Sequence, residues 1–138
     1  MRQGETVFVD SGAWIALALS RDPLHARARE QWDLLRGAGA KLVTSIPVVI
    51  ETFTFLDRNA NRDVALAWKE AISERRAVRV LTCELRDLEK SWEFFRRTDL
   101  HKLSAVDATS FAIMRRNGIR LAYAFDHHFA VVGFRLVG

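Results

Sequence analysis

A short apolar run that ends in an acid constrains this chain more than any other feature. Residues 7–9 are Val, Phe and Val, Asp10 follows them directly, and an apolar helical segment is predicted at 13–19. An unbroken apolar run of this kind is typical of a strand buried on both faces of a parallel sheet. An acid at the carboxyl end of such a strand lies where open α/β sheets bind their ligands. Asp10 is therefore the first candidate site residue.

The rest of the chain alternates short apolar strands with helices. We expect strands at residues 42–44, 78–81, 121–125 and 134–137, the last at an edge, and helices at 22–36, 45–58, 62–76, 84–97 and 104–117, with a loop at 98–103. This alternation predicts a three-layer α/β/α fold with a central, mostly parallel sheet of four to five strands. Because the chain shows no repeats, linkers or low-complexity segments, we expect residues 1–138 to form a single domain.

Composition excludes several classes of protein. The chain is 49% hydrophobic and 28% charged, which is typical of a soluble globular protein. No apolar run approaches the roughly 20 residues that a membrane span needs, so no membrane partner is expected. The single cysteine, Cys83, excludes an internal disulfide and fits a reducing cytoplasm. The net charge is +4, and a basic surface around an acidic centre would suit a polyanionic substrate.

Three further acids are expected to join Asp10 at one edge of the sheet. Glu51 lies in the second turn of the helix at 45–58, Asp107 in the first turn of the helix at 104–117, and Asp126 after the strand at 121–125. Strand carboxyl ends and the starts of the following helices share this edge. Asp10 and Asp126 could instead each cap the turn that follows, and Asp107 could form a capping box with Ser104. Glu51 in an apolar helix is costly unless it is paired or near a cation. Converging carboxylates repel without a cation, and oxygen ligands suit Mg²⁺ or Mn²⁺.

The segments around these acids resemble the PIN-domain ribonucleases, most of all the VapC toxins of bacterial toxin–antitoxin pairs. The likeness covers residues 7–137 in order and rests on Val7-Phe8-Val9-Asp10-Ser11, Glu51 in its apolar helix, Leu103-Ser104-Ala105-Val106-Asp107-Ala108, and Ala124-Phe125-Asp126-His127-His128-Phe129 with Gly133-Phe134. The resemblance implies that the four acids form a catalytic, metal-binding quartet. It also implies that Ser11 holds a metal-bound water and that Asp99 is a further acid near the site, with a less defined role.

The same resemblance implies a function and partners. It implies metal-dependent hydrolysis of single-stranded or loop RNA, which leaves 5′-phosphate and 3′-hydroxyl ends, in the cytoplasm. It further implies a small cognate antitoxin whose tail enters the nuclease groove, and a homodimer of the toxin. A free-standing PIN nuclease without an antitoxin, or a non-catalytic RNA-binding or scaffold protein, stays open as an alternative.

Other polar residues near the acids have two interpretations each. Arg58 lies two helical turns after Glu51 and on the same face, so it could contact substrate phosphate or neutralise the carboxylates. His127 and His128 could act as a general base, but the favoured interpretation is that they are surface or packing histidines in a strand-end turn. Metal-bound water needs no histidine base.

Three other classes of ligand-binding α/β protein fit less well. A dinucleotide-binding domain needs a glycine-rich first turn, and the turn at 10–13 has only Gly12. A phosphoacceptor receiver domain needs an aspartate at the end of its third strand, and the strand at 78–81 is followed by Thr82. A haloacid-dehalogenase-type phosphatase needs a second aspartate two residues after the first, where this chain has Gly12.

Overall fold

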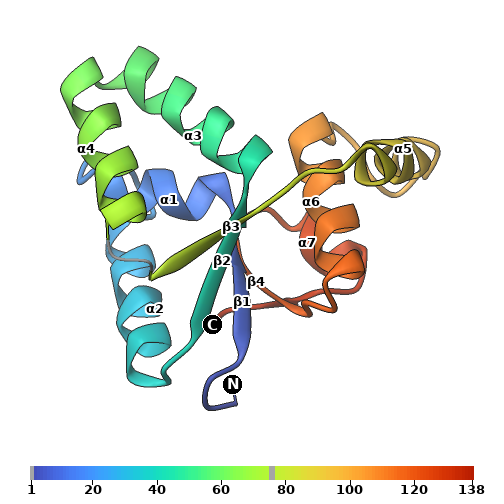
Figure 1. Ribbon diagram of the computed structural model, residues 1–138, viewed down its shortest axis with the longest axis horizontal. Helices are drawn as coiled ribbons and strands as arrows, with labels where there is room; N and C mark the ends of the chain where they lie inside the picture. The colour runs from blue at the N-terminus through green and yellow to red at the C-terminus, as the bar shows by residue number, and fades with distance from the viewer. Residues whose placement is uncertain (1, 75–76) are drawn as a thin grey trace.

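The computed structural model describes residues 2–74 and 77–138. At its centre is a five-stranded, all-parallel sheet with the strand order β3-β2-β1-β4-β5 (Figure 1). The strands are β1 (Thr6–Val9), β2 (Lys41–Ser45), β3 (Val78–Leu81), β4 (Leu121–Tyr123) and β5 (Arg135–Leu136). β1 lies in the middle, and its residues Val7, Phe8 and Val9 are fully buried. The burial on both faces that was predicted for this run is confirmed.

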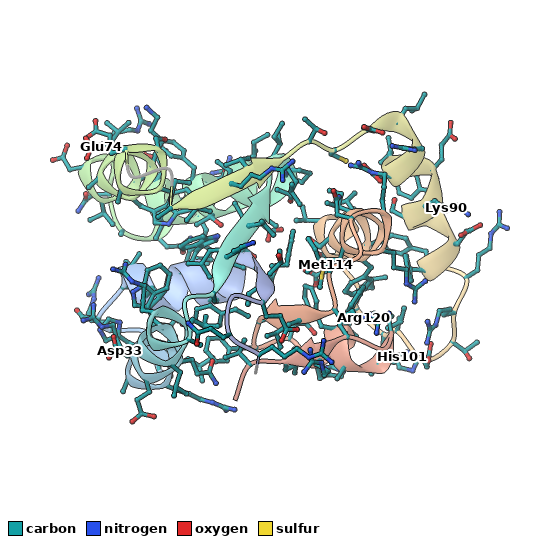
Figure 2. The ribbon with its side chains drawn as sticks, turned by 60° about the horizontal axis from the view of Figure 1, so that its bottom comes forward. Asp33, Glu74, Lys90, His101, Met114 and Arg120 are labelled. Atoms are coloured by element: carbon teal, nitrogen blue, oxygen red, sulfur yellow. The ribbon has the colours of Figure 1, made fainter. Side chains whose placement is uncertain are left out.

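Helices cover both faces of the sheet, so the predicted three layers are confirmed. The helices are α1 (Ser11–Ala18), α2 (His25–Gly37), α3 (Ile46–Asn59), α4 (Arg62–Glu74), α5 (Leu85–Phe94), α6 (Ala105–Arg116) and α7 (His128–Val131). In Figure 1, α1, α2 and α4 lie on one side of the sheet and α5, α6 and α7 on the other. Figure 2 shows the same layers from below, with Asp33 and Glu74 in the first group and Met114 and Lys90 in the second. Within the described ranges, no helix is both long and apolar enough to traverse a bilayer.

Local sequence signals set the ends of the two helices that carry Glu51 and Asp107. The Ser45 hydroxyl accepts a hydrogen bond from the backbone N–H of Val48 at 3.3 Å and so begins α3. The Ser104 hydroxyl accepts the backbone N–H of Asp107 at 3.0 Å and so begins α6. Gly118, with φ of +67°, ends α6 in the left-handed conformation that favours glycine. The starts of both helices and the end of α6 agree with the helices predicted at 45–58 and 104–117.

Several predicted boundaries are wrong. α2 begins later than residue 22, because Asp22 accepts the backbone N–H of Leu24 at 2.8 Å and caps a turn that precedes the helix. α5 ends at Phe94 and β4 at Tyr123, before the expected residues 97 and 125, and β5 is only two residues long. The turn after Asp126 forms the short helix α7. The predicted end of α4 at residue 76 lies outside the described residues.

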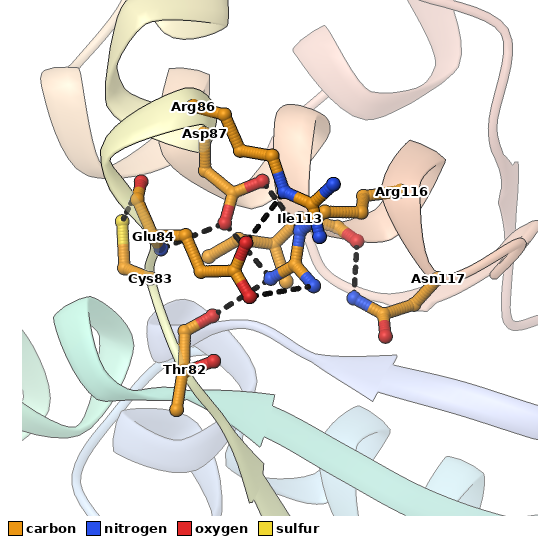
Figure 3. Close-up of polar contacts among 8 residues, drawn as sticks. All are labelled: Thr82, Cys83, Glu84, Arg86, Asp87, Ile113, Arg116 and Asn117. Carbon is orange, nitrogen blue, oxygen red and sulfur yellow. Dashed lines mark hydrogen bonds and ion pairs between the residues drawn. The ribbon is translucent and has the colours of Figure 1, made fainter.

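Helix α5 buries Asp87, Ser91 and Phe94 against the protein and leaves several apolar side chains exposed to solvent. On the inner face, the guanidinium of Arg116 in α6 binds both carboxylate oxygens of Asp87 at 2.8 Å and the carbonyl of Thr82 at 3.1 Å (Figure 3). Asp87 is almost fully buried as a result. We call the outward apolar residues, which are 37–70% exposed, the α5 stripe: Leu85, Leu88, Trp92 and Phe95.

Candidate active site

Asp10 follows β1 and occupies the N-cap position of α1, but its carboxylate makes no side-chain cap hydrogen bond to that helix. The residue is only 3% exposed, and its Oδ1 has no hydrogen-bond partner in the described part of the chain. A buried carboxylate oxygen without a partner is costly, so capping does not account for this side chain. A ligand that the oxygen could bind would account for it.

Asp107 and Asp126 reach the same edge from α6 and from the end of β4. The backbone N–H of Asp107 binds the Ser104 hydroxyl. The pKa of the Asp107 carboxyl is raised by burial first, and then by its neighbours Asp10 and Asp126. Asp126 Oδ1 accepts the backbone N–H of His128 at 2.9 Å. Asp126 therefore caps the α7 turn, as one interpretation expected, and also contacts Asp107.

Glu51 joins the three aspartates from α3. Its Oε1 accepts a hydrogen bond from the Ser11 hydroxyl at 2.5 Å, which links α3 to the start of α1. The negative charge of Glu51 contributes to the raised pKa of both Asp10 and Asp107. The structure thus brings together all four acids that the sequence pattern selected.

The electrostatics of this cluster favour a bound cation. Burial, with the charges of neighbouring carboxylates, raises the pKa of Asp10 to about 7 and that of Asp107 to about 9. Burial also opposes ionisation of Asp126, but the hydrogen bonds from His128 and Asp107 lower the pKa of Asp126 below its usual value. At neutral pH the four acids therefore do not all ionise unless a cation compensates them. An all-oxygen donor set with an unpartnered buried oxygen fits a hard divalent ion such as Mg²⁺ or Mn²⁺.

The structure places the two more remote candidates outside this cluster. Asp99 binds the guanidinium of Arg97 at 2.9 and 2.6 Å, which lowers the Asp99 pKa. Arg58 is exposed on α3. The pKa of the neighbouring Asp57 is lowered mainly by a hydrogen bond from Arg62, with a smaller effect of the Arg58 charge. Over residues 2–74 and 77–138, neither Asp99 nor Arg58 makes a hydrogen bond or ion pair with the four acids. Their roles at the site stay predictions.

The two histidines after Asp126 differ sharply in their surroundings. The His127 side chain is 79% exposed, whereas His128 is 4% exposed. Ligand atoms of His127, His128 and Asp126 all lie within 4.8 Å of one another. Both ring nitrogens of His128 are buried, so this ring is not placed to exchange a proton with a substrate. The structure agrees with the packing interpretation for His128.

The sequence analysis missed Thr44, which hydrogen-bonds to the end of β1, directly before Asp10. Thr44 is fully buried at the end of β2, and its hydroxyl donates to the carbonyl of Val9 at 2.8 Å. The same oxygen accepts the indole N–H of Trp14 at 3.3 Å. A polar residue inside an apolar strand, directly before a capping serine, was the available sequence signal.

Comparisons with known proteins agree with this geometry. The family model of the PIN domain matches residues 7–135. The 23S rRNA-specific endonuclease VapC20 of Mycobacterium tuberculosis is 40% identical over 130 residues, which cover 93% of this chain and 95% of the relative. The crystal structure of M. tuberculosis VapC20, described as a sarcin-ricin loop cleaving toxin, matches with a TM-score of 0.81 and 37% identity, covering 93% of this chain and 95% of the other.

Two more distant structures share the fold. VapBC2 from Rickettsia felis, bound to a DNA fragment from its promoter, has a TM-score of 0.71 at 8% identity and covers 95% of this chain and 96% of the other. DNA-bound VapBC from Salmonella typhimurium has a TM-score of 0.65 at 14% identity and covers 96% of each chain. With the family model spanning nearly the whole chain and a 40% identical VapC relative, this chain belongs to the PIN-domain family.

Proposed function

We propose that this chain is a divalent-metal-dependent endoribonuclease and the toxin of a toxin–antitoxin pair. The observation that carries the proposal is the convergence of four carboxylates at the carboxyl edge of the sheet, two of them with a strongly raised pKa. The 40% identity to a named RNA endonuclease supports RNA as the substrate class. Bound Mg²⁺ or Mn²⁺ would lower the pKa of a water and stabilise negative charge on the phosphate oxygens.

We propose a separate role in metal binding or hydrolysis for each of the four acids. Asp10, Asp107 and Asp126 would hold the ion, and Asp107 keeps a proton toward Asp126 until that ion is bound. Glu51, which accepts a hydrogen bond from the Ser11 hydroxyl, would orient the attacking water. Addition of that water to phosphorus breaks the bond to the 3′ oxygen, which takes up a proton. The products are a 5′-phosphate and a 3′-hydroxyl.

We propose a loop of ribosomal RNA as the substrate, because the relative at 40% identity is named as 23S rRNA-specific. The experiment is primer extension along 23S rRNA after bacterial ribosomes are incubated with the purified protein and Mn²⁺. We expect one strong new end that disappears in excess chelator. If 23S rRNA stays intact while other RNAs are cleaved under the same conditions, the proposed nuclease activity stands and the proposed substrate is rejected.

We also propose a small antitoxin that blocks the acid cluster. Converging carboxylates can accept an arginine in bidentate contact, and the exposed side chains of Ile46 and Ile50 on α3 offer an apolar anchor beside Glu51. Complexes named VapBC among the fold neighbours support such a partner. Expression in a bacterium should arrest growth, and coexpression of the neighbouring small open reading frame should restore it. Harmless expression of soluble, active protein would instead favour a free-standing cytoplasmic PIN nuclease.

The α5 stripe supports a homodimer. Four apolar side chains on one helix face are a surface that a second copy could cover. Replacing Trp92 by Asp should convert the dimer to a monomer in analytical ultracentrifugation, while Lys90→Glu, on the same exposed helix but outside the stripe, should not. A monomeric wild-type protein would reject this proposal without affecting the nuclease site.

A further inference from the structure

His128 carries a buried ring whose two nitrogens make no well-formed hydrogen bond within residues 2–74 and 77–138. The residue opens the short helix α7 and is 4% exposed. Its Nδ1 lies 3.0 Å from Asp126 Oδ1, off the direction of an ideal hydrogen bond, and its Nε2 has no partner among the residues that the structure describes. The same Asp126 oxygen accepts the His128 backbone N–H at 2.9 Å.

Packing alone does not explain a histidine at this position. A buried donor or acceptor without a good partner costs about 1–3 kcal/mol, whereas a leucine or phenylalanine would fill similar space without that penalty. The next residue, Phe129, already supplies aromatic packing to the core: it is fully buried and stacks edge-on against Phe111 with ring centroids 4.9 Å apart. The nitrogen that faces Asp126 is therefore the feature that distinguishes histidine from an apolar residue here.

We propose that His128 is a positioning residue for Asp126, an inference that rests on the proposed metal-dependent function. A carboxylate oxygen can only accept, so Nδ1 carries the hydrogen where it meets Oδ1. The ring N–H and the backbone N–H of His128 then hold Oδ1 from two directions and leave the other Asp126 oxygen for a cation. Partners of this kind orient metal ligands, and their loss typically weakens metal affinity by about 10- to 100-fold.

His127 provides a matched control beside the proposed residue. Its side chain is 79% exposed, and its Nδ1 lies 3.7 Å from the same oxygen, beyond hydrogen-bond distance. A general-base role for His128 would require its ring to meet solvent or substrate, and both of its nitrogens are buried. The inference therefore concerns the orientation of Asp126 and assigns His128 no contact with RNA.

The test measures Mn²⁺ binding to the purified full chain by isothermal titration calorimetry, with thermal unfolding in chelator as a separate readout of folding. His128→Leu should bind Mn²⁺ about 10- to 100-fold more weakly than wild type while unfolding at a similar or higher temperature. His128→Asn places an amide N–H near the position of Nδ1 and should stay within about threefold of wild type. His127→Ala should also match wild type. In an Asp126→Asn background, His128→Leu should cause no further loss.

Each outcome supports or overturns the positioning role. Wild-type affinity in a folded His128→Leu variant would overturn it, as would equal loss in His128→Leu and His128→Asn. If His128→Leu fails to fold, His128→Gln replaces it, because glutamine extends its amide toward the Nε2 position; equal affinities of the Asn and Gln variants would then overturn the role. Absence of Mn²⁺ binding by the wild type would reject the metal-dependent function itself, which separates that failure from this one.

Discussion

Replacing Asp10 by Asn should stabilise the metal-free protein at pH 8. The change removes the charge of a carboxylate that is 3% exposed and keeps nearly the same volume. Burial and the neighbouring acids raise the pKa of Asp10 from 3.8 to about 7. Since one pKa unit corresponds to about 1.4 kcal/mol, ionising Asp10 in the folded state costs up to about 4 kcal/mol once the pH exceeds 7.

The direction of the pH dependence follows from proton binding. The folded state binds the Asp10 proton more tightly than the unfolded state, so this stabilisation is complete below pH 3.8 and is lost as the pH rises through about 7. The Asn variant has no such loss. The variant and wild type should therefore have similar stability at pH 4, and the variant should gain about 1–4 kcal/mol by pH 8. For a domain of this size, 1 kcal/mol corresponds to about 4 °C in Tm.

The assay is thermal unfolding by circular dichroism in excess chelator at pH 4, 6 and 8. Glu89→Gln, a neutralised acid at an exposed position on α5, serves as the control and should change stability by less than about 0.5 kcal/mol at each pH. Added Mn²⁺ should raise the Tm of wild type and leave that of Asp10→Asn nearly unchanged. If Asp10→Asn is no more stable than wild type at pH 8, or gains equally at pH 4, the account of the buried carboxylates is refuted.

Three further predictions test the cluster and its surroundings. Arg116→Ala leaves the buried carboxylate of Asp87 unpaired and should destabilise by about 3 kcal/mol in urea unfolding, whereas Arg86→Ala, which removes a surface pair, should cost less than about 1 kcal/mol. Arg58→Ala should flatten the slope of log affinity for RNA against log salt by about one unit or less, and an unchanged slope would reject a phosphate contact. Mn²⁺ affinity should rise between pH 6 and 9 by up to about tenfold per pH unit for each proton displaced from Asp10 or Asp107, and a flat profile would contradict the raised pKa values.

The elements that the sequence predicts well are those encoded by local signals. The burial of residues 7–9 on both faces of the sheet is predictable because three consecutive apolar residues leave no polar face on the strand. Ser45 and Ser104 identify the starts of α3 and α6 because the cap hydrogen bond spans only three residues. The gathering of the four acids follows from these positions, because all parallel strands end at one edge.

The features that the sequence does not predict depend on contacts between distant segments or on the local folding of loops. Asp87 is buried against Arg116, which lies 29 residues away in the sequence, so the sequence of α5 alone does not reveal this pair. Asp99 matches the expected acid by position, but the fold of its loop pairs it with Arg97, two residues before it. His128 is buried next to an exposed His127 because the two residues stand at the start of the short helix α7. The sequence predicts only a turn at this point.

The most direct measurement of the central claim compares RNA cleavage by wild type and Asp107→Asn at saturating Mn²⁺. Asp107 is buried beside Asp10 and Asp126, and burial with these neighbouring acids raises its pKa to about 9. Both proteins should unfold cooperatively, so that loss of activity is not loss of fold. The account predicts metal-dependent cleavage by wild type and only background cleavage by Asp107→Asn. Wild-type cleavage rates in the variant, or undiminished wild-type activity in excess chelator, would contradict it.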